Sequence, residues 1–262
     1  MENLLNLTTY PLTRLQSPEG MALVTKCKAA LAKDGMFTLD GFLRDEVILR
    51  AVAEVSPTLE TAAHTHARTH NIYFKPDIPG LAPDHPALRE CQTVNHTICA
   101  DQLRGTIVSQ LYEWPPFAAF LAAVMDKPQL YPMIDPLAPV NVMAYHEGEA
   151  LNWHFDRSEF TTTLLLQAPK KGGEFIYRTD LRSDDDPNYD GVARLLNGED
   201  EQAQQMTLSA GSLNVFKGKN TAHRVSPVEG ARARIIAVFS YFERPGVEFT
   251  DAERLGFYGR TG

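Results

Sequence analysis

The sequence predicts an α+β fold in which N-terminal helices support a core of strands. Residues 1–128 contain apolar positions at helical spacing. From residue 129 onward, short segments rich in Val, Ile, Thr, Phe and Tyr are separated by Gly, Pro, Asp and Asn. These strand segments cluster in one half of the chain and do not alternate with helices, which favours a sandwich or barrel over a doubly wound sheet.

Two helices are expected near the start of the chain. Ser17 followed by Pro18 is typical of a helix start, and the apolar residues that follow recur at helical spacing until Gly35. A second helix is expected over residues 45–55. It should stop before Pro57, because the residue that precedes a proline avoids the helical region.

The rest of the N-terminal part predicts two more helices and a loop. The helices are expected over residues 87–113 and 116–125. Residues 64–86 are rich in His, Pro and Asp and predict a long loop. Loops of this length in compact proteins are usually functional or disordered, so we expect residues 63–86 to form a lid.

Five strands are expected in the C-terminal half, and residues 180–205 are expected to form an acidic surface excursion between two of them. The expected strands are Val140–Tyr145, Thr161–Gln167, Glu174–Tyr177, Ser212–Phe216 and Arg234–Phe242. We therefore expect one domain over residues 1–262, with helical support in 1–128, the core in 129–245 and a tail in 246–262.

The composition excludes several classes of protein. Acidic residues number 33 and basic residues 25, so the net charge is −8, whereas a nucleic-acid binder needs a positive surface. No signal peptide is visible, and the most apolar stretch, Phe117 to Met125, is too short to span a bilayer. The three cysteines are unpatterned and predict buried free thiols of a reducing compartment. We expect a cytoplasmic protein with a small-molecule substrate and no nucleic-acid or membrane partner; the oligomeric state is left open.

The segment Trp153-His154-Phe155-Asp156, together with His223, is the main candidate for chemistry. Residues i and i+2 of a strand point to the same side, so His154 and Asp156 can face one metal ion while His223 reaches it from another strand. Two imidazoles and one carboxylate leave one face of an octahedral ion open, which suits Fe(II) in oxygen chemistry, although zinc hydrolases use similar ligands. The alternative is a structural histidine near a turn aspartate, because His-x-Asp alone is a common pair.

Two arginines follow the second histidine. Arg232 and Arg234 open an apolar strand, from which an arginine can reach the same barrel mouth and hold a carboxylate in two-point contact. Arg234 is preferred because it shares a strand face with Ile236 and Val238. Arg232 is the second candidate, and the alternative for either is an ordinary exposed arginine.

Taken together, the motifs over residues 130–243 resemble the Fe(II)/2-oxoglutarate-dependent dioxygenases. The matching motifs are His154-x-Asp156, Gly172-Gly173-Glu174-Phe175, the GSLNVF strand, His223-Arg-Val-x-Pro-Val and the arginines after it. The resemblance implies a double-stranded β-helix (jelly-roll) core. It also implies Fe(II) bound by His154, Asp156 and His223, and 2-oxoglutarate bound by Arg234 or Arg232. With O2 as the second cosubstrate, such an enzyme hydroxylates an unactivated C–H bond and releases succinate and CO2.

Within this superfamily the sequence is most similar to hydroxylating relatives of the free-lysine radical halogenases. The cues are Asp135-Pro136-Leu137, Trp153-His154-Phe155, Phe160 and the Leu-Gln before the Gly-Gly hairpin. In the halogenases a small residue replaces the carboxylate ligand and opens a site for halide. Asp156 is present here, so the resemblance favours hydroxylation, of a free amino acid or an amino-acid-like metabolite. Desaturation and ring closure are the other outcomes of hydrogen abstraction.

Five residues are candidates for substrate contacts: Arg68, His70, Tyr73, Asp135 and Tyr145. In the expected lid, Arg68 receives a substrate carboxylate, and His70 or Tyr73 adds hydrogen bonds. Tyr145 ends the strand before the iron motif and can bond 2-oxoglutarate or substrate, and Asp135 can receive a substrate ammonium. The alternative for Tyr145 is a half-buried tyrosine with a structural role in its strand, and the alternative for Asp135 is an ordinary surface carboxylate.

Several other readings stay open at this point. The histidines at 64, 66 and 70 can form an independent zinc site or belong to a solvated loop. A jelly-roll binding protein can use the same pocket without catalysis. A prolyl-hydroxylase-type enzyme can act on a peptide, but it needs a wide groove, whereas the long loop favours a closed pocket.

Overall fold

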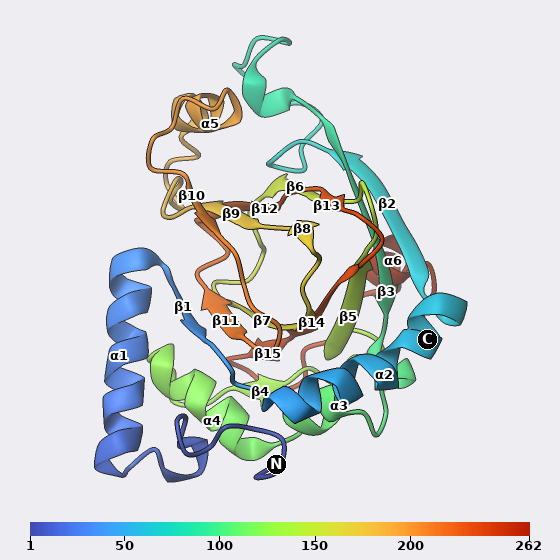
Figure 1. Cartoon of the computed structure of the whole chain (residues 1–262). Helices are drawn as coiled ribbons and strands as arrows, with labels where there is room; N and C mark the ends of the chain where they lie inside the picture. Colours follow the sequence, from blue (N-terminus) through green and yellow to red (C-terminus); the bar gives the residue numbers. More distant parts are fainter.

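The computed structural model describes all 262 residues and contains two main antiparallel sheets that face each other (Figure 1). The strands are β1 (Met36–Leu39), β2 (His64–His70), β3 (Cys91–Ile98), β4 (Tyr131–Pro132), β5 (Val140–Tyr145), β6 (Leu151–His154), β7 (Thr161–Gln167), β8 (Lys171–Gly172), β9 (Phe175–Arg178), β10 (Gln204–Met206), β11 (Leu213–Phe216), β12 (Ala222–Val225), β13 (Val228–Glu229), β14 (Arg234–Phe239) and β15 (Tyr241–Phe242). The larger sheet has the order β1-β11-β7-β14-β5-β3-β2 and the smaller β10-β9-β12-β6, with the pairs β13-β8 and β15-β4 beside them.

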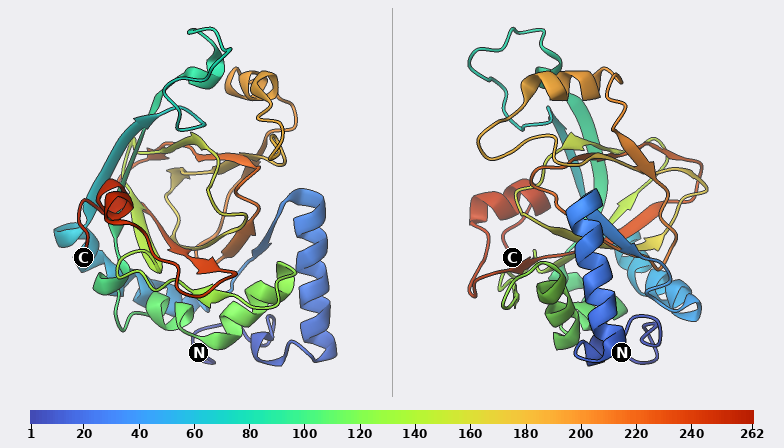
Figure 2. Two further views of the ribbon diagram at one scale, coloured as in Figure 1. Left: turned by 180° about the vertical axis from the view of Figure 1, so that it is seen from behind. Right: turned by 90° about the vertical axis from the view of Figure 1, so that its left-hand side faces the viewer.

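The helices lie outside the sheets, and most of them pack on one side (Figures 1 and 2). They are α1 (Pro18–Asp34), α2 (Asp45–Ala62), α3 (Ile107–Tyr112), α4 (Pro115–Val124), α5 (Tyr189–Leu196) and α6 (Asp251–Tyr258), with 3-10 turns at Leu12–Arg14, Pro86–Leu88 and Ala100–Gln102. None of the helices combines the length and the apolarity needed to cross a bilayer.

The strands of the larger sheet present different side chains to its two faces, because successive residues point to opposite sides. In β7, Leu164 and Leu166 pack in the hydrophobic core under the helices, whereas Thr163 lines the cavity between the sheets. In β14, Ala237 packs in that core, and Arg234 lines the cavity. One face of the sheet therefore stabilises the fold, and the other carries the site.

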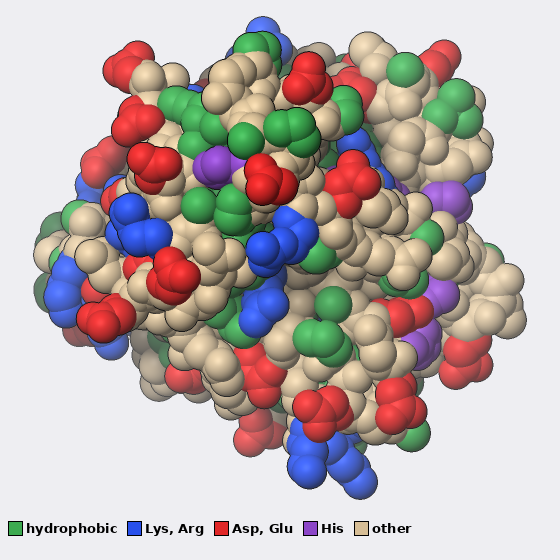
Figure 3. Space-filling view, turned by 90° about the horizontal axis from the view of Figure 1, so that it is seen from above, with side chains coloured by type: hydrophobic (Ala, Val, Ile, Leu, Met, Phe, Trp, Pro, Cys, Tyr) green, Lys and Arg blue, Asp and Glu red, His purple; other side chains and the backbone are tan.

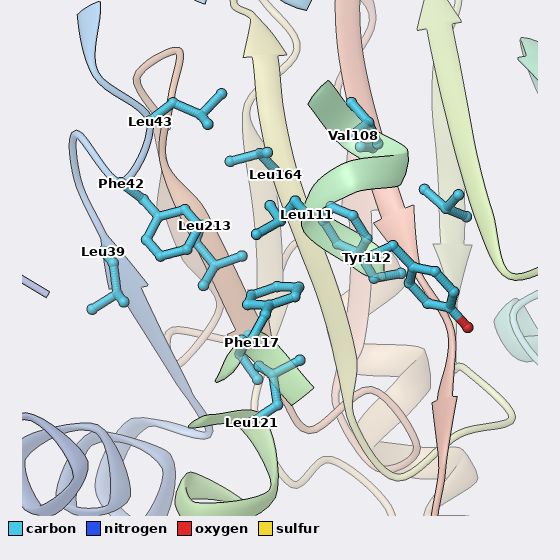
Figure 4. Packing of buried hydrophobic residues seen from close by; sticks show 14 of the residues in the cluster. Leu39, Phe42, Leu43, Val108, Leu111, Tyr112, Phe117, Leu121, Leu164 and Leu213 are labelled. Atoms are coloured by element: carbon cyan, nitrogen blue, oxygen red, sulfur yellow. The ribbon is translucent and has the colours of Figure 1, made fainter. Parts of the chain in front are cut away.

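The main core lies between the larger sheet and helices α1 to α4. It contains 36 buried residues, whereas the two clusters that line the interior contain five each, so most of the apolar burial is on the helix side. Figure 4 shows Phe117 and Leu121 of α4 packed near Leu213 of β11 and Leu164 of β7. The helices thus hold the sheet in place while its inner face remains open for polar groups.

Both ends of α1 agree with the sequence prediction. The Ser17 hydroxyl accepts a hydrogen bond from the backbone N–H of Gly20 at 3.2 Å. Gly35 closes the helix with a φ of 72°, a left-handed conformation that favours glycine. The fourth expected helix is also confirmed as α4, and the five expected strands coincide with β5, β7, β9, β11 and β14–β15 to within a few residues.

The predictions for residues 64–113 are partly wrong. The segment His64–His70 is not a loop but β2, an edge strand that pairs along its whole length with β3. Its His, Thr and Arg side chains hide the strand pattern, because an edge strand with an exposed face tolerates polar residues. The loop is confined to residues 71–85, and only Ile107–Tyr112 of the third expected helix is α-helical. The N-terminal part therefore adds strands as well as helices.

Helix α2 continues through Pro57 to Ala62, so the prediction that it stops before the proline is wrong. Pro57 lacks the backbone donor that would reach the carbonyl of Ala53, and the helix continues without that hydrogen bond. Beyond the proline, Leu59 packs against the main core, which stabilises the last turns. Packing thus outweighs the local preference.

Two smaller expectations also need correction. Cys91 is exposed, whereas Cys27 and Cys99 are buried as expected. The acidic excursion contains the helix α5, whose Val192 and Leu195 are buried. Acidic and basic side chains are interspersed on the face of the molecule seen in Figure 3.

Asp135 fastens the C-terminal segment, which was expected to be a tail but contains α6. Its side chain is fully buried and accepts hydrogen bonds from the backbone N–H groups of Leu137, Ala138 and Phe249 at 2.8, 3.0 and 2.9 Å. It also accepts one from Arg254 Nε at 2.8 Å. Burial by itself raises the pKa of Asp135, but these bonds lower it below its usual value. The prediction that Asp135 receives a substrate ammonium is wrong, because its oxygens are already occupied.

We predict that Asp135→Asn destabilises the protein by about 3–5 kcal/mol, because the buried carboxylate loses its charge and an amide NH2 group faces donors such as Phe249 N–H and Arg254 Nε. The measurement is urea unfolding at pH 7. Because the pKa of Asp135 is lower in the folded state, its contribution is present above the unfolded-state value of about 4 and is lost as the pH falls below it. The difference in the free energy of unfolding between wild type and Asp135→Asn should therefore become smaller as the pH is lowered.

The matched control is Asp251→Asn. Asp251 also pairs with Arg254, at 3.0 Å, but its side chain is 74% exposed. Exposed pairs contribute about 1 kcal/mol or less, so the control should remain close to wild type. Equal losses in the two variants would contradict the role given to Asp135.

Candidate active site

The side chains of His154, Asp156 and His223 meet between the two sheets. Strand β12 runs antiparallel to β6, with His223 directly opposite His154, and the centroids of the two rings lie 4.1 Å apart. Asp156 follows two residues after the end of β6. Its Oδ1 lies 3.3 Å from His154 Nε2 and 3.5 Å from His223 Nε2. The structure therefore brings together the three residues that the sequence motif singled out, with their candidate ligand atoms all within 4.8 Å of one another.

Backbone carbonyls orient both imidazoles. His154 Nδ1 donates to the carbonyl of Asn152 at 2.8 Å, and His223 Nδ1 donates to the carbonyl of Thr221 at 3.0 Å. A carbonyl oxygen only accepts, so Nδ1 carries the hydrogen and a neutral ring keeps a lone pair on Nε2. This is the arrangement in which a histidine binds a metal through Nε2.

Two neighbours fix the Asp156 carboxylate. Its Oδ2 accepts a hydrogen bond from the Thr161 hydroxyl, and its backbone N–H donates to the Gly218 carbonyl at 3.0 Å. A Cβ on residue 218 would lie 2.3 Å from Asp156 Oδ2, so only glycine leaves room for the carboxylate. The sequence analysis missed Gly218 because a glycine between two strands has many explanations and nothing marked this contact.

The electrostatics of the cluster keep the carboxylate charged. When the imidazoles are protonated, the charge of His223 and hydrogen bonds from both Nε2 atoms hold the pKa of Asp156 well below its usual range, although burial by itself raises it. Burial by itself lowers the pKa of His223, and Asp156 raises it above the ordinary value. Burial and His223 lower the pKa of His154. Two imidazole nitrogens and an anionic oxygen thus face one point, and this donor set fits a divalent ion of the 2-His-1-carboxylate kind.

Arg234 lies in the same cavity without a carboxylate partner. Its side chain is 2% exposed, and its guanidinium carbon lies 5.8 Å from the centroid of the Tyr145 ring. A Cβ on residue 173 would lie 3.1 Å from Arg234 Cδ, so Gly173 permits this close packing. Burial lowers the pKa of Arg234. An unpaired buried charge is costly, so the position is suited to an anionic ligand.

Arg232 lies elsewhere. It is exposed and borders a separate surface hollow, together with Leu59 and Gln167. The prediction that Arg232 reaches the mouth of the barrel is wrong, because Arg234 lines the cavity and Arg232 does not. Arg234, Ile236 and Val238 do share it, as the alternation along β14 predicts.

The cavity has a volume of about 810 Å³, which is in the range of small-molecule sites. Both sheets line it, and Arg68, His70, Tyr73 and Tyr145 also contribute to its wall. The Arg68 guanidinium lies 4.9 Å from the centroid of the Phe74 ring. Tyr145 is buried, which raises its pKa to about 12.

His70 and Tyr73 are held by structural contacts. His70 bonds to the Asn71 carbonyl and to the Thr93 hydroxyl, both at 2.9 Å, so both of its ring nitrogens are occupied. The zinc site considered for histidines 64, 66 and 70 is therefore not formed. The Tyr73 hydroxyl donates to the carbonyl of Pro187 and so joins the 71–85 loop to the acidic excursion.

A second cluster, which the sequence analysis did not single out, consists of His96, His146 and Glu149. His96 Nε2 lies 2.8 Å from Glu149 Oε1, and His96 Nδ1 lies 3.1 Å from the Thr65 hydroxyl. The backbone N–H of His146 donates to Glu149 Oε2 at 2.7 Å. Hydrogen bonds thus account for this cluster.

Comparisons with known proteins agree with this geometry. A family model described as Halogenase D matches residues 20–250, and no curated protein sequence matches significantly. Among solved structures, a 2OG-Fe(II) oxygenase family member from Burkholderia pseudomallei is similar at 15% identity, over 86% of this chain and 92% of that chain, with a TM-score of 0.52. A Pseudomonas putida prolyl-4-hydroxylase is similar at 16% identity, over 85% and 100%, with a TM-score of 0.53.

A third similar structure is the epimerase SnoN in complex with Fe3+, alpha ketoglutarate and nogalamycin RO. It is similar at 15% identity, over 85% of this chain and 84% of that chain, with a TM-score of 0.53. At such identities the likeness concerns the fold. It confirms the predicted α+β class with a jelly-roll core, and the family match confirms the superfamily resemblance.

We predict that Gly218→Ala weakens the binding of Co(II) to the cluster by about tenfold or more, because the new methyl group displaces the Asp156 carboxylate. The measurement is metal titration followed by visible absorption. Gly256→Ala is the control, since a Cβ there meets no atom within 4 Å. Unchanged affinity in Gly218→Ala would show that this contact does not position the carboxylate.

Proposed function

The chain belongs to the halogenase D family and is an oxygenase of the Fe(II)/2-oxoglutarate type, and from this premise we propose that it hydroxylates an unactivated C–H bond of a small polar molecule. The substrate class we propose is a free amino acid or an amino-acid-like metabolite. The observation that carries the proposal is that two imidazole lone pairs and the Asp156 carboxylate converge in a cavity that also holds the unpaired guanidinium of Arg234.

In this proposal His154, Asp156 and His223 hold Fe(II). The bound ion, together with 2-oxoglutarate and O2, supplies the oxidising chemistry, with succinate and CO2 as coproducts. The chain contributes fixed geometry: two carbonyls hold the imidazole rings, and Thr161 and Gly218 hold the carboxylate. Ligands held in this way need little rearrangement when the ion binds.

Arg234 is proposed to bind the distal carboxylate of 2-oxoglutarate. Its position on the inner face of β14 and its lack of a carboxylate partner support this role. The planar guanidinium can donate two parallel hydrogen bonds to one carboxylate, and the ion pair would offset the cost of burying the charge. Tyr145 lies against the guanidinium and limits its movement.

The walls of the cavity favour a small molecule over a peptide. The hydrogen bond from Tyr73 to Pro187 and the edge-on contact of Tyr73 with Tyr189, at 5.4 Å between centroids, join the 71–85 loop to the acidic excursion. A peptide hydroxylase needs an open groove at this place. A small molecule that fills this cavity would also exclude water from the reaction, as oxidising chemistry requires.

Hydroxylation is proposed in preference to halogenation, in spite of the name of the family. Halide transfer needs a coordination position that a small residue leaves free, whereas Asp156 places a charged oxygen there. The fixed position of this carboxylate, bonded by Thr161 and packed on Gly218, supports its role as a ligand.

We predict that anaerobic addition of Fe(II) and 2-oxoglutarate to the wild-type protein produces a weak visible absorption band, and that a metabolite screen then finds substrate-stimulated succinate. Asp156→Ala should lower hydroxylated product by about a hundredfold or more, because one of three ligands is lost. Asp156→Gly in the presence of chloride should yield a small amount of chlorinated product. Product is measured by mass spectrometry.

The control for these variants is Asp185→Ala, which removes an exposed carboxylate of the acidic excursion. Full hydroxylation by Asp156→Ala would contradict the assignment of the ligands. Binding of 2-oxoglutarate without succinate release on a broad screen would favour a binding protein instead.

We predict that Arg234→Gln raises the KM for 2-oxoglutarate by about tenfold or more, because a charge-assisted pair is lost. Arg232→Gln should change this KM by less than about twofold, since Arg232 lies outside the cavity. The measurement is succinate formation as a function of 2-oxoglutarate concentration. A larger rise in the KM for 2-oxoglutarate in Arg232→Gln than in Arg234→Gln would assign 2-oxoglutarate binding to Arg232 instead.

A further inference from the structure

We propose that the substrate is a dicarboxylic molecule and that Arg182 binds one of its carboxylates. The inference rests on the proposed function and concerns the part of the cavity that 2-oxoglutarate does not use. Arg182 had no role in the sequence analysis, because it lies in the acidic excursion between strands. The structure places it in the wall of the same cavity as the metal cluster.

Positive side chains outnumber carboxylates around the cavity. Its lining contains five Lys or Arg side chains and a single carboxylate, Asp156, which is committed to the metal cluster. A substrate with two ammonium groups has a net positive charge and finds no free carboxylate in this lining to balance it. This disfavours a diamino acid such as lysine and favours an anionic molecule.

Only some of these cations have a carboxylate partner. Arg157 pairs with Glu253 at 2.8 Å, and Lys219 pairs with Asp184 at 2.6 Å. Arg234 is assigned to 2-oxoglutarate. Two guanidinium groups remain without a carboxylate partner, those of Arg68 and Arg182. Two free guanidinium groups and no free acid match a ligand with two carboxylates.

The side chain of Arg182 is preorganised. Its guanidinium carbon lies 3.9 Å from the centroid of the Phe155 ring, and its Nε donates to the Lys219 carbonyl at 2.9 Å. These contacts fix the plane of the group and leave Nη1 and Nη2 for a ligand. A planar pair of donors fits a carboxylate in two-point contact, and little rotamer entropy is lost when the ligand binds.

The side chains of Arg68 and Arg182 line the cavity that contains the metal cluster. Phe155, on which Arg182 stacks, lines the same cavity as the metal cluster, and Phe74, on which Arg68 stacks, lies 6.2 Å from the His154 ring. Both guanidinium groups are thus supported by aromatic rings that adjoin the metal cluster. A molecule bound by its two ends would present its central carbons to the ion, where a C–H bond can react.

The test is succinate formation by the enzyme loaded with Fe(II) and 2-oxoglutarate. The probes are L-aspartate, L-glutamate and L-2-aminoadipate, with L-glutamine and L-lysine as matched neutral and basic compounds. We expect a dicarboxylic probe to stimulate succinate at least about tenfold more than glutamine or lysine, because a charge-assisted pair is lost with either. Preference for glutamine or lysine, or no response to any dicarboxylic probe, would overturn the inference.

Variants of Arg182 locate the contact. Arg182→Gln should raise the KM for the best acid by about tenfold or more while the KM for 2-oxoglutarate changes less than about twofold. Arg182→Lys keeps the charge but loses the planar guanidinium. Its KM for the acid should lie between those of wild type and Arg182→Gln. Arg194→Gln is the control, because it removes an exposed charge from α5 in the same excursion. If the KM values for the acid in Arg182→Gln and Arg194→Gln are equal, Arg182 does not bind it.

The anaerobic absorption band separates the two levels of the proposal. If wild type lacks the band with Fe(II) and 2-oxoglutarate, the proposed function fails. If the band is present in wild type and in Arg182→Gln, both proteins are folded and loaded, and the succinate results then decide the substrate class alone.

Discussion

The pairing of β12 with β6 is the constraint on which the site depends. Antiparallel register places His223 opposite His154, and the carbonyls of Thr221 and Asn152 turn both imidazoles in the same way. A slip of one residue would send one imidazole to the other face of the sheet. The register is secured by the neighbouring strand β9, which pairs with β12 from Ala222 to Val225. The position of the site is therefore set by backbone hydrogen bonds far more than by the histidines themselves.

A site of this kind concentrates charges that oppose folding. Arg234 is buried without a carboxylate partner. The imidazole lone pairs of His154 and His223 face the Asp156 carboxylate. The apolar core on the other face of the larger sheet offsets this cost, since the helices α1 to α4 bury most of the hydrophobic side chains there. The division of one sheet into a stabilising face and a reactive face follows from the period of two along each strand.

Sequence reasoning succeeded where a pattern has one physical meaning and failed where it has several. The strands at β5, β7 and β14 were predicted because Val, Ile, Thr, Phe and Tyr are concentrated there between turn-forming residues. The three clustered residues were predicted because His-x-Asp lies between two such strands. The edge strand β2 was read as a loop, since its exposed face carries His, Thr and Arg. The contact of Gly218 with Asp156 joins segments far apart in the chain, and no local pattern reports it.

Asp135 and Asp156 have different roles, which the sequence does not distinguish and the structure does. Asp135 and Asp156 both have a pKa below the ordinary value, but for different reasons. Asp135 is surrounded by donors: three N–H groups and Arg254 occupy its oxygens, so it is a structural anchor. Asp156 has one oxygen bonded by Thr161 and the other directed at two nitrogens that are themselves acceptors when neutral. Three acceptors that face one point repel each other unless a cation lies between them, and that is the physical reason to look for a metal at Asp156 and not at Asp135.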